Sequence, residues 1–318
     1  MWRFAVNKAA SEAVKIAKGT DSAPLRRRRR GVLITLAALL IIAVTAVLAD
    51  TAAAITGEYR LSRALLAAPR VSFDPEVTIG GFPYAAHAAG GTFPGAVITA
   101  RGVAVAGCGI HGGCRAELGA RLGRFRVGDG WRIDRDDTMH VSAIHAYTRL
   151  DSVNLGRFLN ILDLTVNTPA PAGTVGGGGP QDGLLQRTSG IALTGTVALP
   201  PTNVPVTGYP TPVGVPSSSK YPGRKAKVCV TVDVSVHDRR LHLQATGLCT
   251  GPENHVTADA VSGPGNAAVR TAVLARFSTT LPPLPLPWGL APTGAHSEGS
   301  DVLLVADSGP RDLRPDKF

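Results

Sequence analysis

The sequence predicts an α+β fold in which one membrane-spanning helix precedes an exported domain built on an antiparallel sheet. Two observations carry this prediction. Residues 31–49 contain no charged side chain, and beyond residue 70 apolar and polar side chains alternate at the period of a β-strand. Two short segments with helical spacing, after Asp151 and after Pro264, interrupt the alternating stretches and supply the helical component.

The uncharged run at residues 31–49 is close to the roughly 20 residues that a helix needs to cross the hydrocarbon core. Five consecutive arginines, Arg26 to Arg30, come directly before it, and the positive-inside rule keeps them cytoplasmic. Everything after Asp50 is then exported to the periplasmic side. A cleaved signal peptide is the alternative, but its basic region and its apolar run would both exceed the usual limits. We therefore expect a single-pass anchor that stays in the cytoplasmic membrane.

The net charge of +10 belongs mostly to the cytoplasmic tail. Residues 1–30 carry nine basic and two acidic side chains, which leaves a net charge of only +3 on the rest of the chain. A nucleic-acid-binding protein should carry its basic excess on the folded domain. The sequence therefore predicts no nucleic-acid partner, and the basic tail is expected to lie beside anionic lipid.

A helical pattern continues through residues 50–70 as a juxtamembrane helix that Pro69 ends. The exported domain is expected to span residues 71–307, with residues 308–318 as a C-terminal tail. Strands are predicted at Val77–Ile79, Val97–Val105, Ile191–Leu199, Lys227–Val236, Leu241–Ala245 and Val302–Ala306. The stretches 169–183 and 200–224, rich in glycine and proline, are interpreted as long loops inserted on either side of one strand.

All four cysteines follow the anchor and so lie on the oxidising side of the membrane, where two disulfides are expected. Three pairings are open, and we favour the local one. Cys108 and Cys114 would close a glycine-rich loop, while Cys229 and Cys249 would face each other across a predicted hairpin. A zinc site that uses His111 is the alternative, but the spacing does not match usual zinc ligands. We expect no metal.

The sequence contains no recognisable catalytic constellation. None of its serines lies in a Gly-x-Ser-x-Gly elbow, and Arg132 and Arg135 interrupt the aspartates at positions 134, 136 and 137. His140 and His145 are five residues apart in an extended segment, which predicts that they point to opposite faces. We therefore predict no catalytic residue, no cofactor and no enzymatic activity.

Two motifs are more specific. Residues 74–103 read DPEVTIGGFPYAAHAAGGTFPGAVITARGV, which resembles the opening signature of the actinobacterial LmeA-like family: a strand, then Gly-Phe-Pro-aromatic, a short helix and a second strand. Near the other end, Leu284-Pro285-Leu286-Pro287-Trp288-Gly289-Leu290 is similar to the family's closing segment. The resemblance covers roughly Val71 to Ala306. The sequence departs from the family's pattern in its two long loops and in its two expected disulfides, which we would not assume for the family.

The resemblance implies an exported phospholipid-binding protein linked to the maturation of lipomannan and lipoarabinomannan in the cell envelope. It also implies a tubular lipid-binding-like fold, in which a curved antiparallel sheet wraps a long helix and leaves an apolar groove. Lipid contacts would then lie at Phe82, Pro83, Tyr84, Leu284, Pro285, Pro287 and Trp288. For each motif, a purely structural role as a turn or a rigid extended segment stays open.

Two functional hypotheses follow. The first is a phospholipid-binding or transfer module, anchored by residues 31–49 and possessing a phospholipid ligand. The second is a scaffold that shares the fold but binds no lipid and serves an envelope glycosyltransferase complex of glycolipid synthesis. An apolar surplus beyond the needs of the core would separate them, and the sequence does not reveal such a surplus.

Overall fold

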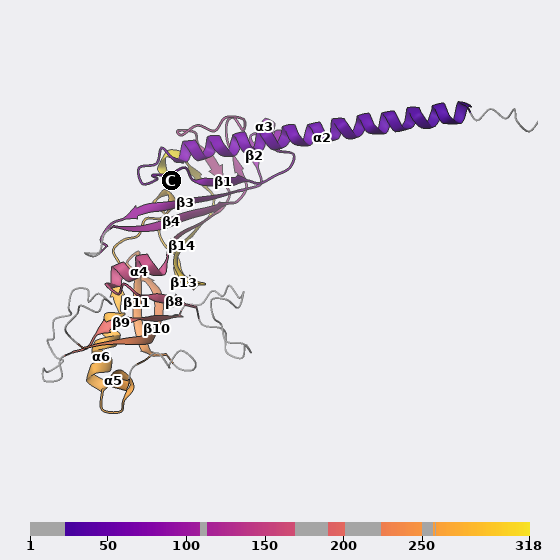
Figure 1. Cartoon of the computed structure of the whole chain (residues 1–318). Coiled ribbons are helices and arrows are strands. Elements are labelled where there is room, and N and C mark those ends of the chain that lie inside the picture. Colours follow the sequence, from indigo (N-terminus) through magenta and orange to yellow (C-terminus); the bar gives the residue numbers. More distant parts are fainter. Residues whose placement is uncertain (1–22, 109–112, 169–189, 201–223, 250–256, 258) are drawn as a thin grey trace, which may run out of the picture. The chain divides into compact units, whose positions relative to one another are not determined.

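The computed structural model describes residues 23–108, 113–168, 190–200, 224–249, 257 and 259–318. The chain divides into two compact units, Met1–Ala53 and Ala54–Phe318, and each is considered by itself (Figure 1). Most of the basic tail, the predicted loop at 169–183 and nearly all of the loop at 200–224 lie outside the described residues.

One long helix, α2 (Ala23–Leu65), begins in the first unit and ends in the second. The predicted anchor and most of the predicted juxtamembrane segment are therefore a single helix. Its stretch Val32–Leu65 is long and apolar enough to cross a membrane, a property shared by membrane anchors and signal sequences. The hydroxyl groups of Thr45 and Thr51 donate to carbonyl oxygens one turn earlier, which satisfies these polar groups inside an apolar helix.

The second unit contains three antiparallel sheets. The six-stranded sheet has the order β1-β3-β4-β7-β14-β13, with β1 (Glu76–Ile79), β3 (Ala96–Val105), β4 (Cys114–Leu122), β7 (Ile144–Leu150), β14 (Asp301–Ser308) and β13 (Gly294–Glu298). The four-stranded sheet has the order β15-β6-β5-β2, with β15 (Arg311–Leu313), β6 (Met139–Val141), β5 (Phe125–Arg126) and β2 (Thr92–Phe93). The five-stranded sheet has the order β12-β11-β10-β9-β8, with β12 (Thr279–Thr280), β11 (Arg240–Leu248), β10 (Lys225–His237), β9 (Gly190–Ala198) and β8 (Thr165–Asn167).

The four-stranded sheet continues four strands of the six-stranded sheet after a bend. Two residues interrupt each strand at the same level, at 94–95, 123–124, 142–143 and 309–310. Backbone bonds from Gly123 N to Ala143 O, at 2.8 Å, and from Ser142 N to Arg124 O, at 2.9 Å, carry the pairing through the bend. The two sheets therefore act as one bent sheet, and we use that name for them below.

The bend shifts the alternation of side chains by one residue. In a regular strand, residues three apart point to opposite faces. Here Leu122 and Phe125 are both buried, and so are Val141 and Ile144 on the neighbouring strand line. Residues five apart across the bend consequently share a face.

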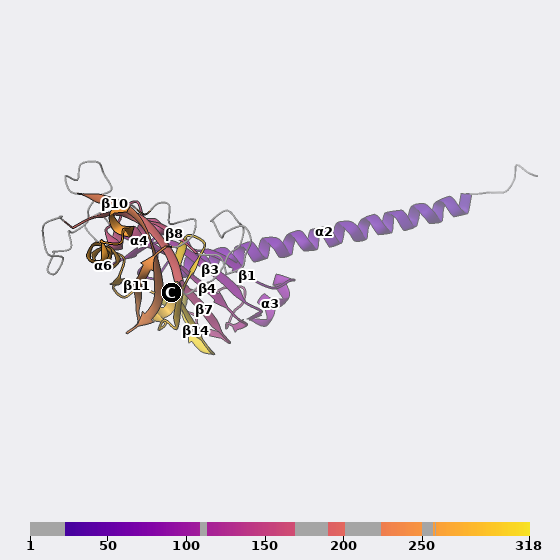
Figure 2. The same cartoon turned by 90° about the horizontal axis from the view of Figure 1, so that it is seen from below.

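Short helices complete the unit: α3 (Tyr84–Gly90), α4 (Ser152–Leu159), α5 (Asp259–Ser262) and α6 (Ala267–Arg276). The carboxylate of Asp151 accepts a bond from Asn154 N at 2.7 Å and so caps α4, as the sequence predicts. Helix α6, predicted after Pro264, lies against β11 of the five-stranded sheet (Figure 2).

The last turns of α2 are part of the core of the second unit. Leu61 and Leu65 are fully buried, and the hydroxyl of Ser62 donates to the carbonyl of Pro75 at 2.6 Å. Gly57 lets the ring of Tyr84 lie against the helix, since a Cβ at this position would come within 1.9 Å of the tyrosine oxygen. The predicted α+β class, with antiparallel sheets and one long N-terminal apolar helix, is confirmed.

Some elements differ from the sequence prediction. Residues 308–318, predicted as a C-terminal tail, contain β15, which pairs with β6, and the 3-10 helix η3 (Pro315–Lys317). Strand β15 has only three residues, two of them charged, so no alternating pattern reveals it. Strand β4 was not predicted because two of the five residues on its apolar face are alanines, which make the alternation weak.

Candidate functional site

The first family motif is divided between surface and core. Phe82 is 71% exposed and Pro83 is also exposed, whereas Tyr84 is only 2% exposed. The ring of Tyr84 lies 5.6 Å from that of Phe93 and meets Trp131 edge-on at 6.2 Å. Burial raises the pKa of the Tyr84 hydroxyl. Tyr84 is thus a core residue, and only the turn before it is available to a ligand.

The second motif packs mainly inside the domain. Leu284 and Pro287 are buried, and the hydroxyl of Thr148 donates to the carbonyl of Pro285. Trp288, in the 3-10 helix η2 (Pro287–Gly289), is half-buried; its Nε1 donates to Arg314 O at 2.9 Å, and its ring meets Phe318 edge-on at 4.9 Å. These contacts tie the chain end to the bent sheet, and a lipid contact at these residues stays a prediction.

The structure places the two motifs at opposite edges of the four-stranded sheet. Tyr84 packs against Phe93 of β2, the strand at one edge. Trp288 binds Arg314, which directly follows β15 at the other edge. These contacts therefore do not bring the two motifs together into one patch.

Both disulfides have the local pairing. Cys108 is bonded to Cys114, with Cα atoms 5.6 Å apart, and Cys229 to Cys249, with Cα atoms 5.3 Å apart. Cys229 and Cys249 are buried together with Ala192. His111, the third ligand of the alternative zinc site, lies outside the described residues. Within the described ranges, no group of three or more His, Cys, Asp or Glu side chains could hold a metal ion.

The outer face of the bent sheet carries two matching rows of polar side chains. On one side of the bend, Arg126 is the register partner of His140, and His140 of Asp312. On the other side, Arg121 is the partner of His145, and His145 of Asp307. Directly opposed residues of neighbouring strands share a face, so each row is a cross-strand series Arg–His–Asp.

In each row the histidine binds the aspartate. Nδ1 of His140 lies 2.5 Å from Oδ1 of Asp312, and Nδ1 of His145 lies 2.7 Å from Oδ1 of Asp307. The prediction that His140 and His145 point to opposite faces is wrong. The shifted alternation at residues 142–143 turns both imidazoles outward, with side chains 60% and 32% exposed.

Along the strand direction the same residues form columns. Arg121, Arg124 and Arg126 follow one strand line through the bend, and all three are exposed. The two arginines at the ends of this column are five residues apart, as are the two histidines and the two aspartates. We call Arg121, Arg124 and Arg126 the arginine column. The repeated five-residue spacing is visible in the sequence. It indicates a shared face only once the bend between the two sheets is known.

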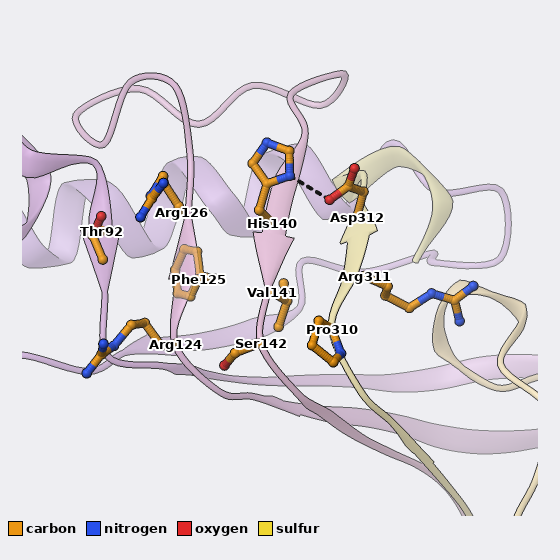
Figure 3. Close-up of a pocket in the computed structure, with 10 residues that line it drawn as sticks. All are labelled: Thr92, Arg124, Phe125, Arg126, His140, Val141, Ser142, Pro310, Arg311 and Asp312. Atoms are coloured by element: carbon orange, nitrogen blue, oxygen red, sulfur yellow. Dashed lines mark hydrogen bonds and ion pairs between the residues drawn. The ribbon is translucent and has the colours of Figure 1, made fainter.

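Two shallow pockets open on this face. One of about 560 Å³ is lined by Arg124, Arg126, His140 and Asp312 among others (Figure 3). The second, of about 530 Å³, includes Arg121, His145 and Asp307. Arg311 borders the first pocket, but its register partner Val141 is buried, which places Arg311 on the other face of β15.

Farther from the bend, near the end of β7, Arg149 is surrounded by carboxylates. Its guanidinium lies 3.6 Å from Glu117, 3.5 Å from Asp301 and 3.9 Å from Glu298. The hydroxyl of Tyr147 donates to Glu117 at 3.1 Å. Burial raises the pKa of both Asp301 and Tyr147. The guanidinium of Arg149 is thus paired with carboxylates, unlike those of the arginine column.

Comparison with curated proteins and with solved structures gives no match. Residues 48–307 match the model of a family described as LmeA-like phospholipid-binding. The matched region begins inside helix α2 and ends in β14, so it contains both motifs and almost all of the bent sheet. The chain therefore belongs to the LmeA-like phospholipid-binding family.

Proposed function

We propose that the chain is a membrane-anchored phospholipid-binding and transfer protein of an actinobacterial cell envelope. The family match over residues 48–307 carries this proposal, because it extends over nearly the whole second unit. The apolar stretch Val32–Leu65 supports an anchor in the cytoplasmic membrane, and the two disulfides support a periplasmic domain. In this proposal the bound lipid serves lipomannan and lipoarabinomannan maturation, beside a glycosyltransferase complex.

The proposed mechanism is non-covalent. Acyl chains leave the bilayer for an apolar surface of the domain, and the head group stays at its polar rim. Each methylene removed from water contributes about 0.8 kcal/mol, so eight to ten methylenes would supply roughly 6 to 8 kcal/mol before ordering costs. Such binding requires no general acid, base or nucleophile.

Phe82 and Pro83 are the motif residues best placed for lipid contact. Phe82 is 71% exposed at the turn before α3, and a large aromatic side chain left in water gains free energy from apolar contact. The remaining motif residues would act by holding that turn and the chain end in place.

A scaffold without a lipid ligand is the second candidate. One observation favours it: Tyr84, Leu284 and Pro287 are buried among the domain's own side chains rather than left open for a ligand. A scaffold would need only the fold and an exposed docking face.

Native mass spectrometry separates the two. Residues 51–318, which lack the predicted membrane span 31–49 but keep the last turns of α2, would be expressed for export and purified without detergent. The lipid-binding proposal predicts phospholipid adducts on the intact domain. A lipid-free domain that takes up no phospholipid from vesicles would contradict that proposal and favour the scaffold. Turnover of a mannosylated lipid would instead identify an enzyme.

A further inference from the structure

We propose that the arginine column docks the second unit onto bilayers that contain anionic phospholipid. The inference deepens the proposed function, and rests on it in one respect: a domain that exchanges lipid with a bilayer must approach that bilayer. The occupant of this face is a lipid surface whose phosphates face the guanidinium groups of Arg121, Arg124 and Arg126.

The three arginines of the column lie in one line along the bent sheet. Arg121 precedes the end of β4, Arg124 lies in the bend and Arg126 ends β5, all on one strand line. Because the bend shifts the alternation by one residue, Arg121 and Arg126 share the outer face, and Arg124 joins them two residues before Arg126. Three guanidinium groups in a line on an open sheet face can contact several phosphates of a flat surface at once.

The guanidinium groups of the column have no partner within the part of the chain that the structure describes. None of the three forms a side-chain hydrogen bond or an ion pair there. Elsewhere on the sheets the pattern differs: Arg101 pairs with Glu117 at 3.3 Å, and Arg149 lies among three carboxylates. The column therefore keeps its charge available for an external anion.

The aspartates nearest to the column already have hydrogen-bond partners. Asp307 and Asp312 stand two strands away from the column, a separation of about 10 Å, with a histidine between in each row. Each aspartate binds that histidine, as Figure 3 shows for His140 and Asp312. On the other side of the column, Thr92 and Val97 are the uncharged register partners of Arg126 and Arg121.

The nature of the partner follows from the shape of the face. The two pockets are shallow and lie next to each other along the bend, a geometry that suits a broad surface of phosphates better than one enclosed small anion. Val97, 46% exposed beside Arg121, adds an apolar contact suited to the interfacial region of a bilayer. A soluble phosphate would use the charges but not Val97.

The test uses the full chain, held by its apolar helix in phosphatidylcholine nanodiscs. Binding to phosphatidylcholine vesicles, with and without phosphatidylglycerol, is measured by flotation. The triple variant Arg121→Gln, Arg124→Gln, Arg126→Gln is compared with a control, Arg70→Gln, Arg239→Gln, Arg240→Gln, which removes three exposed arginines elsewhere. At about fivefold per arginine, the column variant should lose roughly a hundredfold in affinity for the anionic vesicles.

The control variant should bind as the unaltered chain does, and added salt should weaken that binding. Equal binding by both variants, or no preference for phosphatidylglycerol in the unaltered chain, would overturn the proposal. Inhibition by inorganic phosphate at concentrations far below those of added salt would assign the column to a soluble anion instead, and also overturn it. Circular dichroism confirms that each variant is folded.

Native mass spectrometry of residues 51–318, with and without the three column substitutions and purified without detergent, separates this inference from the proposed function by measuring bound phospholipid. A column variant that still contains bound phospholipid but no longer docks would support the inference and leave the proposed function intact. An unaltered chain that docks but never contains or takes up phospholipid would support the inference and contradict the proposed function.

Discussion

Nδ1 of His145 lies 2.7 Å from Oδ1 of Asp307, and Arg121 stands next to this pair without binding either partner. Across the bend, His140, Asp312 and Arg126 repeat the arrangement. The histidines hold the aspartates in place and keep them away from the arginines. The outer face of the bent sheet carries both arginines and aspartates, but of these only the arginines of the column are left without a partner among the described residues.

Removing the charge of Asp307 should strengthen docking. Asp307→Asn keeps the size of the side chain but removes one negative charge from the outer face. We expect affinity for phosphatidylglycerol vesicles to rise about fivefold, the reverse of an arginine loss. Asp238→Asn, in the turn between β10 and β11, removes an equal charge elsewhere and should change little. Unchanged docking by Asp307→Asn would show that the surface charge is not the determinant.

Gly57→Ala should destabilise the second unit, although alanine favours a helix by about 1 kcal/mol over glycine. The added Cβ would come within 1.9 Å of the Tyr84 oxygen, and overpacking of this kind typically costs about 1 to 3 kcal/mol. Denaturant unfolding measures the change. Gly265→Ala, where a Cβ meets no atom within 4 Å, is the matched control. A stabilised Gly57→Ala protein would mean that Tyr84 does not pack on the helix.

Phe82 and Trp288 should respond differently to substitution. Phe82→Ser alters an exposed side chain, so lipid uptake should fall while the free energy of unfolding changes by less than about 0.5 kcal/mol. Trp288→Phe removes the bond to Arg314 O and should cost about 1 kcal/mol of stability with lipid uptake retained. Uptake assays and urea titrations on both variants check this. The opposite pattern would assign the lipid contact to Trp288.

Asp301→Asn should stabilise the second unit at neutral pH. Burial raises the pKa of Asp301 above its ordinary value of 3.8, even though Arg149 acts in the other direction. A raised pKa in the folded state favours folding below the unfolded pKa, and that contribution is lost as the pH rises through the folded pKa. The charged form is thus a cost at neutral pH, which asparagine avoids.

Urea unfolding at several pH values tests this. The difference between Asp301→Asn and the unaltered protein should be largest at neutral pH and should shrink as the pH falls toward 4. An unaltered protein more stable than Asp301→Asn at neutral pH would show that attraction to Arg149 outweighs burial.

The sequence predicted what depends on local pattern. The charge-free run after Arg30 identified the long apolar helix, and the alternating valines of Lys227–Val236 identified β10 with its disulfide-linked hairpin. The two motifs identified the LmeA-like phospholipid-binding family. These features are encoded within windows of a few to about twenty residues.

What depends on the bend was not predictable. The five-residue spacing of His140 and His145 indicates opposite faces in any regular strand, and only the interruption at residues 142–143 reverses this. Asp307 and Asp312 lie more than 160 residues further along the chain, so their pairing with the histidines is a product of sheet topology. The burial of Tyr84 against α2 is likewise a product of tertiary packing. The sequence does not reveal it, and Tyr84 was therefore predicted as a lipid contact.

Phospholipid uptake tests the central claim most directly. Residues 51–318 are incubated with phosphatidylglycerol vesicles, the vesicles are removed by flotation, and the lipid phosphorus that remains with the protein is measured. The account predicts stoichiometric phosphorus in the vesicle-free protein fraction. Folded protein that leaves the vesicles without phosphorus would contradict it.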